Sequence, residues 1–219
     1  MQERRFDVAL LPVIDYQRME GLRLLPVGGI GSEGETLTVR IFSPKPIEKI
    51  ETLACDTDSH TSVTLARIIL AERYGIRPEF VDLKSDRHRA DQAMLLIGDK
   101  VVCEEPVGLE HQLDLGAAWR EMTGLPFVFA AWMVREGVEL GDLADRLERA
   151  KRAGLSNVSE IITRHAVSRG WPAGVALQYL TIYMRYDIGP RQLEAIRLFY
   201  RKAAEQGIVP APARELRLD

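Results

Sequence analysis

The chain has 219 residues, of which 46% are hydrophobic and 28% charged, so a packed core in one large or two small domains is expected. The formal net charge of -3 excludes the basic surface that nucleic acid or an anionic membrane requires. No apolar run reaches the roughly 18 residues that a membrane span needs. The opening residues contain neither the apolar core nor the cleavage site of a secretory signal. We therefore expect neither a nucleic-acid-binding protein nor a membrane protein, and an anionic small molecule remains a possible partner.

The first 42 residues predict three strands. Residues 6–11 form an apolar run that ends at a proline, and residues 22–27 form a second run that two glycines close. Residues 31–34, with the sequence Gly-Ser-Glu-Gly, predict a loop. After this loop, apolar and polar residues alternate over 37–42, as in a strand with two unlike faces.

The segment between residues 52 and 102 predicts a compact βαβ unit. A strand at 53–55 is followed by a polar turn and by a helix that Gly75 ends. Two further strands are expected at 80–83 and 94–97, separated by a charged loop.

The remainder of the chain is mainly helical. A helix is expected from Leu115 to the glycine at 124, then a buried strand at 126–132 and four helical stretches. Asn157 and Glu160 have the spacing of a capping box, and the tail at 210–219 is expected to be loose.

This order of elements indicates an α/β fold of two hinged lobes with a helical C-terminal third. We expect residues 1–37 and 133–219 to form one lobe and residues 38–132 the other. Ligands of such folds lie between the lobes, beyond the carboxyl ends of strands.

The turn at residues 56–62, Asp-Thr-Asp-Ser-His-Thr-Ser, is the most informative segment. Ser59 or Asp58 can cap the following helix, whose free first-turn N–H groups then form a cradle for a carboxylate or phosphate. His60, if protonated, would add positive charge there. The alternative is an ordinary helix cap.

Two more positions are candidates for ligand contact. Gly98 and Asp99 follow a buried strand, where the glycine permits close approach and the carboxylate can orient a hydroxyl. Thr38 lies on a strand that we place at the cleft. For Gly98 and Asp99 the alternative is a plain turn. For Thr38 the alternative is a packing role on the strand without contact to a ligand.

The cysteines and histidines suggest no metal site. Cys55 and Cys103 lie in apolar runs and are expected to be buried and unpaired. None of the four histidines has metal-ligand spacing, and His165 is expected to be structural.

Five segments together resemble the chorismate dehydratase family of the futalosine route to menaquinone. The resemblance implies a fold like type II periplasmic binding proteins, used by a cytoplasmic enzyme. It implies removal of water from chorismate to give 3-[(1-carboxyvinyl)oxy]benzoate, with no metal or organic cofactor. The resembling segments are residues 7–16, 53–70, 94–100, 113–132 and 186–210.

The resemblance also assigns roles to individual residues. Thr38 matches a family serine in the substrate pocket and is the candidate catalytic residue. His60 supports a bound carboxylate where the family often has arginine. No strong base is evident, in keeping with a family mechanism thought to use a basic group of the substrate. The candidate substrate-binding residues are Pro12, Val13, Ser59, His60, Thr61, Ser62, Gly98 and Asp99.

The chain departs from the family pattern at its start. The family begins with a further strand–helix unit that carries a substrate-binding asparagine, so we expect a first lobe without its central strand and weak turnover. The sibling 1,4-dihydroxy-6-naphthoate synthase should carry a catalytic histidine, and neither His88 nor His111 has a convincing context. Two further classes are alternatives: a solute-binding protein, which would need an export signal that the visible start does not show, and a non-catalytic carboxylate sensor. The sequence does not predict the oligomeric state.

Overall fold

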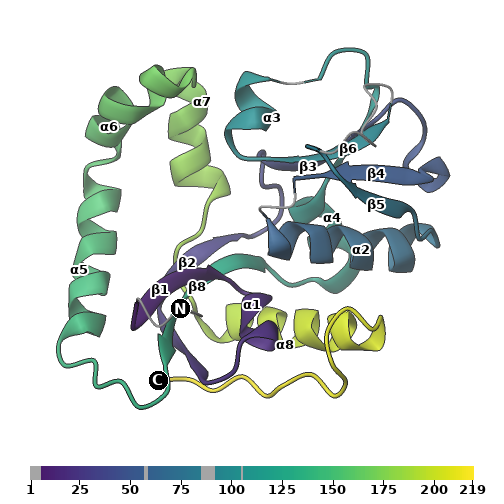
Figure 1. The fold of residues 1–219 in the computed structure, drawn as a ribbon. Helices are drawn as coiled ribbons and strands as arrows, with labels where there is room; N and C mark the ends of the chain where they lie inside the picture. The colour runs from purple at the N-terminus through teal and green to yellow at the C-terminus, as the bar shows by residue number, and fades with distance from the viewer. Residues whose placement is uncertain (1–5, 57–58, 85–91, 105) are drawn as a thin grey trace.

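The computed structural model describes residues 6–56, 59–84, 92–104 and 106–219. They form two sheets with helices packed around them, as Figure 1 shows. The first sheet has three antiparallel strands in the order β1-β8-β2, and these are β1 (Val8–Pro12), β8 (Phe127–Arg135) and β2 (Leu22–Ser32).

The second sheet is mixed. Its β5-β4-β6 part is parallel, whereas β3 pairs antiparallel with β6 and β7. In order across the sheet, the strands are β5 (Glu79–Asp82), β4 (Thr52–Cys55), β6 (Ala93–Ile97), β3 (Val39–Ser43) and β7 (His111–Asp114). The expected α/β class with two lobes is therefore confirmed, although the sequence did not predict β7.

The chain passes from the first sheet to the second through residues 33–38 and returns through residues 124–126. The sequence-based boundary put residues up to 132 in the second lobe. All of β8, however, is paired with β1 and β2, so the return crossing comes before Phe127.

One hydrophobic core runs through both sheets and the helices between them. Trp119 is fully buried and packs edge-to-face on Phe127 and Phe199, which joins three elements in one cluster. The helices in or beside this core are α1 (Asp15–Arg18), the short η1 (Ile47–Lys49), α2 (His60–Tyr74), α4 (Leu115–Thr123) and α8 (Pro190–Glu205).

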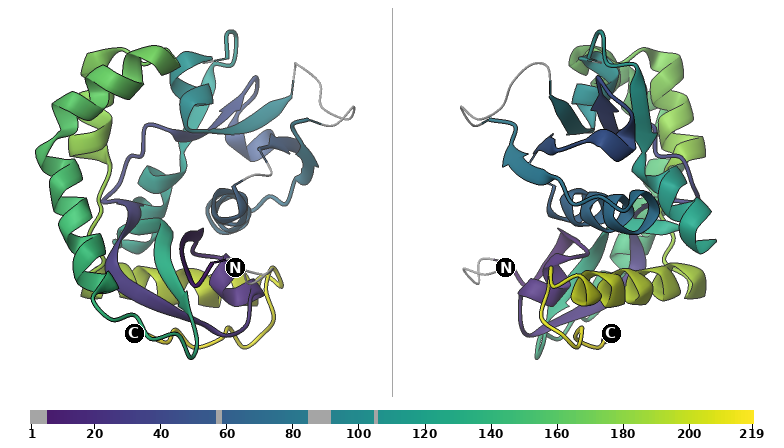
Figure 2. Two further views of the ribbon diagram at one scale, coloured as in Figure 1. Left: turned by 60° about the vertical axis from the view of Figure 1, so that its left-hand side comes forward. Right: turned by 90° about the vertical axis from the view of Figure 1, so that its right-hand side faces the viewer.

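Residues 143–183 form a helical arm that connects the two sheets along one side of the molecule (Figure 2). Its base packs on β2, where the Lys151 ammonium donates to the Val27 carbonyl at 3.1 Å. Its tip lies against α3 (Asp99–Cys103), and Val102 packs on a small cluster within the arm. The arm comprises α5 (Leu143–Ser156), α6 (Val158–Ile161), η2 (Ile162–Ala166), η3 (Val167–Arg169), α7 (Ala173–Gln178) and η4 (Tyr179–Tyr183).

β2 continues through the glycines at 28–29, which were expected to end it, and reaches Ser32, so only residues 33–34 of the predicted loop lie outside a strand. A Cβ on Gly29 would lie 2.5 Å from the Ala130 carbonyl oxygen, and one on Gly31 would lie 2.6 Å from that of Phe127. The glycines therefore let β2 approach β8 closely, and two register shifts absorb the irregularity.

The sequence located some helix ends correctly and others not. Gly75 ends α2 in the left-handed region with φ 68°, as predicted. The capping box at Asn157 is wrong, because its side-chain amide donates to the Ala153 carbonyl of the preceding helix.

The C-terminal tail is docked, not loose. The Arg217 N–H donates to the Tyr16 hydroxyl at 2.9 Å, and its carbonyl accepts from the Leu24 N–H at 2.8 Å. Leu216 is buried between these contacts. Backbone pairing with residues almost 200 positions earlier was not visible in a local pattern.

The two cysteines differ in exposure, so the prediction is right for Cys55 and wrong for Cys103. Burial raises the pKa of the Cys55 thiol to about 12, whereas Cys103 lies on the surface. Since the thiolate is the reactive form, we expect a disulfide reagent at pH 8 to modify one thiol in the native protein and two after denaturation. A Cys103→Ser variant should show no native reaction, and modification of Cys55 in that variant would contradict the buried position.

Among the described residues, no helix is long and apolar enough to cross a membrane.

Candidate active site between the second sheet and the arm

Most of the predicted site residues lie where β4 and β6 end, whereas Pro12 and Val13 lie at the end of β1 in the first sheet. These strands are parallel neighbours, with Cys55 opposite Leu95, so both carboxyl ends open on the same edge of the sheet. Asp56 follows β4, and an ion pair joins it to Lys100 just beyond β6. The structure thus brings Asp56, at the start of the predicted turn, close to the segment that holds the predicted Gly98 and Asp99.

Ser59 occupies the N-cap position of α2, but its hydroxyl donates to the Ser62 hydroxyl at 2.7 Å and makes no cap bond to the described backbone. The first helical bond at this end runs from the Val63 N–H to the Ser59 carbonyl. The N–H groups of residues 60–62 therefore have no acceptor within the helix, and the positive end of its dipole faces this edge. Asp58, the other predicted cap, lies outside the described residues.

The hydroxyls in the first turn of α2 lie in the protein interior. Thr61 and Ser62 are each 2% exposed. The Thr61 hydroxyl accepts from the Ile14 N–H at 3.5 Å, and that of Ser62 accepts from Ser59. If the turn binds an anion, as predicted, its backbone N–H groups are therefore better candidates than these hydroxyls.

His60 has a partner in the other lobe. Its Nδ1 lies 2.9 Å from a carboxylate oxygen of Asp15 on α1, and its side chain is 49% exposed. The same carboxylate oxygen lies 3.6 Å from the Arg18 guanidinium. His60 therefore bridges the lobes beside the turn, in addition to any contact with a ligand.

Val13 belongs to the core. It is 0% exposed, its N–H donates to the Phe129 carbonyl at 3.0 Å and its carbonyl accepts from the Tyr200 hydroxyl at 2.7 Å. We therefore remove Val13 from the candidate site. Pro12, the last residue of β1, is half-buried and stays a prediction.

Thr38 lies at the crossing between the sheets, directly before β3. Its carbonyl accepts from the Gly98 N–H at 2.9 Å, so these two predicted residues are in contact. Its hydroxyl donates to the Tyr179 hydroxyl at 3.3 Å, which connects the second sheet to the arm. Gly98 has φ 62°, a conformation that favours glycine.

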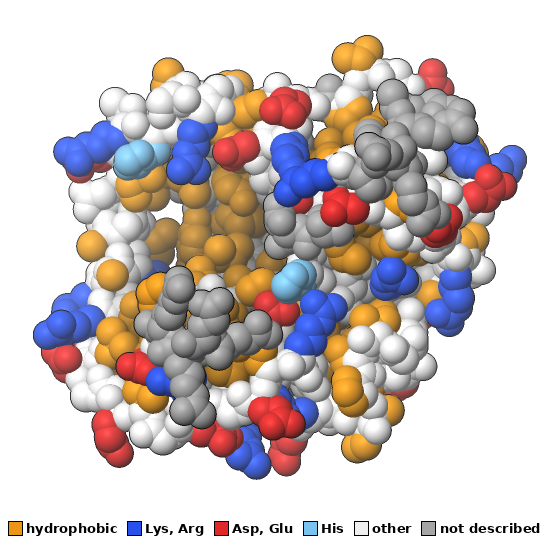
Figure 3. Space-filling model, in the orientation of Figure 1, with side chains coloured by type: hydrophobic (Ala, Val, Ile, Leu, Met, Phe, Trp, Pro, Cys, Tyr) orange, Lys and Arg blue, Asp and Glu red, His pale blue; other side chains and the backbone are white. Residues whose placement is uncertain are grey.

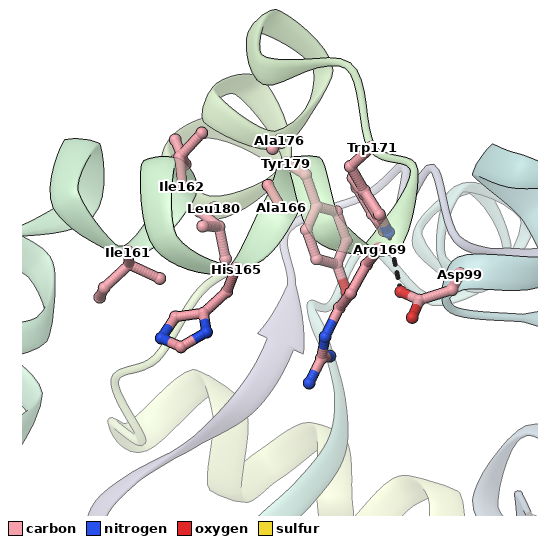
Figure 4. Close-up of a pocket in the computed structure, with 10 residues that line it drawn as sticks. All are labelled: Asp99, Ile161, Ile162, His165, Ala166, Arg169, Trp171, Ala176, Tyr179 and Leu180. Atoms are coloured by element: carbon pink, nitrogen blue, oxygen red, sulfur yellow. Dashed lines mark hydrogen bonds between the residues drawn. The ribbon is translucent and has the colours of Figure 1, made fainter.

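The arm carries a cavity of about 150 Å³, called here the arm pocket. Nine of its ten lining residues come from the arm, and the tenth is Asp99 of α3 (Figure 4). Trp171 and Tyr179 form an aromatic wall with ring centroids 5.0 Å apart. The Trp171 indole N–H donates to the Asp99 carboxylate at 2.8 Å, which holds the arm against the second sheet.

The Tyr179 hydroxyl is protonated at neutral pH. Burial raises its pKa, the hydrogen bond from Thr38 lowers it, and the Asp99 carboxylate raises it again. Because the neutral Tyr179 hydroxyl accepts a hydrogen bond from Thr38, its own O–H group can still donate to another acceptor.

The sequence did not identify the arm pocket. His165, expected to be structural, is exposed and lines the cavity, as does Arg169. Two π-helical segments, residues 162–166 and 179–183, contribute to the lining. Such segments are rare and frequently occur at functional sites, but no sequence periodicity reveals them.

Figure 3 shows a hollow between the arm and the sheets that is lined by hydrophobic side chains and bordered by charged ones. This surface suits an anion with an apolar body. The described residues contain no group of three or more His, Cys, Asp or Glu side chains placed to hold a metal.

Sequence comparisons relate the chain to proteins of menaquinone biosynthesis. The model of a family described as menaquinone biosynthesis matches residues 1–205. The chorismate dehydratase of Thermus thermophilus is 30% identical over 185 residues, which cover 73% of this chain and 67% of that protein. The 1,4-dihydroxy-6-naphthoate synthase of Streptomyces coelicolor is 26% identical over 223 residues, 94% of this chain and 77% of that protein.

The fold is also found in transport proteins. The periplasmic aliphatic sulphonate binding protein of Escherichia coli superimposes with a TM-score of 0.60 at 13% identity, over 99% of this chain and 78% of that one. At this identity the likeness shows the fold alone, and it confirms the expected likeness to periplasmic binding proteins.

Proposed function

We propose, from the premise that the chain belongs to the menaquinone biosynthesis family, that it is a chorismate dehydratase. The reaction would remove water from chorismate and give 3-[(1-carboxyvinyl)oxy]benzoate. We place it in the cytoplasm and assign the edge of the second sheet and the facing arm as its active site.

The observation that carries this proposal is the pairing of an anion-binding helix start with a ring-sized apolar cavity. Residues 60–62 present N–H groups without a helical acceptor beyond β4, and the arm pocket borders Asp99 beyond the neighbouring β6. A cavity of about 150 Å³ lined by apolar side chains can hold one benzene ring. Chorismate is a six-membered ring with two carboxylates, so it matches both features.

The elimination breaks the bond between a ring carbon and the hydroxyl oxygen, while a neighbouring ring carbon loses its proton. The electron pair of that C–H bond forms the new ring double bond, and water leaves. Since the product ring is aromatic, the protein has mainly to orient the substrate and exclude water. Thr38 is buried behind the cavity and donates to the Tyr179 hydroxyl, which leaves the proton of the cavity-lining Tyr179 free to be donated to the departing oxygen.

The test is incubation with chorismate and detection by mass spectrometry of a product lighter by one water. In the double variant Ser59→Ala/Thr61→Ala, we expect substrate binding to weaken by roughly 1–3 kcal/mol, seen as a higher KM. Thr163→Ala on the exposed face of the arm is the matched control and should leave KM unchanged. Because turnover is expected to be weak, the incubation is prolonged, and chorismate that neither binds nor yields product would refute the proposal. An unchanged KM in the double variant would assign the carboxylate to the backbone N–H groups of the turn alone.

The alternative activity is that of 1,4-dihydroxy-6-naphthoate synthase, which the second relative carries. The observation in its favour is His165 on the arm pocket, because this sibling should use a catalytic histidine. Absence of chorismate turnover in the intact protein together with activity on the sibling's substrate would select it.

A further inference from the structure

Arg169 is a cation at the arm pocket that the described part of the protein does not neutralise. Its guanidinium makes no hydrogen bond or ion pair with any described residue, although the side chain lines the cavity. Its backbone is held in place, since its carbonyl accepts from the Cys103 thiol of α3 at 3.2 Å. Arg164, earlier in the same helical segment, is by contrast paired with Glu160 at 2.5 Å.

The remaining wall of the cavity is mostly apolar and aromatic. Ile162, Ala166, Ala176 and Leu180 lie around the Trp171–Tyr179 pair. Figure 4 shows the side chains of His165 and Arg169 extending from the arm helix toward the same side of the cavity. A charged group beside an apolar wall is favourable for a ligand that has an anionic end and a cyclic body.

Asp99 makes the α3 side of the cavity differ in charge from the side where Arg169 lies. Its carboxylate accepts from the Trp171 indole at 2.8 Å and so lies on the α3 side. It accepts from a hydroxyl and repels a carboxylate placed beside it, so a second carboxylate on the ring has to point away from α3. A ring that carries both groups is therefore oriented with its carboxylate toward Arg169 and its hydroxyl toward Asp99.

We propose that Arg169 binds one carboxylate of a cyclic dicarboxylate, whose ring lies against Trp171 and Tyr179, and that it sets the preference of the arm pocket for anionic rings. The inference rests on the proposed function, because chorismate is the cyclic dicarboxylate that we expect Arg169 to bind. It assigns to the arm a role in recognition that is separate from the turn at residues 60–62. The planar guanidinium suits this role because it can donate two parallel hydrogen bonds to a carboxylate.

Binding of benzene-1,3-dicarboxylate to the intact protein, followed by calorimetry, tests the inference. Relative to the unchanged protein, we expect Arg169→Gln to weaken binding roughly tenfold to a hundredfold and Arg169→Lys to be intermediate. Arg164→Gln removes the same charge from a position that does not line the cavity, and it should change affinity by less than about twofold. Melting temperatures of all three variants should match the unchanged protein, because both arginines are exposed.

The outcomes separate this inference from the proposed function. Product from chorismate with equal KM in Arg169→Gln and Arg164→Gln would overturn the inference and leave the function standing. Arg169-dependent binding of the dicarboxylate without any turnover of chorismate would support the inference and overturn the function. Failure of the unchanged protein to bind the dicarboxylate would overturn the inference.

Discussion

Replacing Asp114 with alanine is expected to lower the free energy of unfolding by about 3–4 kcal/mol. This carboxylate accepts from the Thr36 N–H and hydroxyl and from the Leu37 N–H at 2.9–3.1 Å. It also caps α4, where it accepts from the Gly116 and Ala117 N–H groups at 3.0 Å. One side chain thus holds both the crossing between the sheets and a helix start, and its loss leaves several buried donors without an acceptor.

Asp142→Ala is the matched control in a urea unfolding experiment. Asp142 also occupies an N-cap position, that of α5, but it makes no side-chain cap bond in the described structure and is 64% exposed. Its surface pair with Arg146 should contribute less than about 0.5 kcal/mol. Equal losses of unfolding free energy in the two variants would show that Asp114 does not hold the crossing segment and the start of α4 together.

Asp114 also determines the backbone geometry next to the candidate site. Leu37 has φ 66°, a conformation that costs energy for a residue with a side chain, and its N–H is held by Asp114. Thr38 follows directly, so its bonds to Gly98 and Tyr179 depend on this strained turn.

Replacing Gly116 with alanine is expected to destabilise the protein by about 2–3 kcal/mol, although alanine is the better helix former. A Cβ here would lie 2.3 Å from the Gly34 carbonyl oxygen and 2.5 Å from the Thr36 methyl group. Since the first of these is backbone, α4 has to move away from the crossing segment, and overpacking of this kind costs more than helix propensity gains.

Gly154→Ala in α5 makes the same change where there is space. An added Cβ meets no described atom within 4 Å, so we expect this variant to be more stable by about 0.5–1 kcal/mol. Urea unfolding of both variants measures the difference. A shift of the same sign in the two proteins would contradict the close packing of α4 on the crossing.

The sequence by itself determined the α/β class, the βαβ unit and most element positions. These depend on local chemistry: apolar runs of strand length, helical periodicity, and Gly75 at the end of α2. The turn at residues 56–62 was recognisable for the same reason, because a helix start exposes N–H groups wherever it lies.

Only the tertiary structure decided which residues meet. Thr38 and Tyr179 are 141 positions apart, and Asp99 and Trp171 are 72 apart, so no local pattern predicts their contact. The arm pocket forms because helices rooted on the first sheet reach α3 of the second, and its π-helical segments follow from that packing. The docked tail and the exposed Cys103 have the same origin, since burial depends on which surfaces the whole chain brings together.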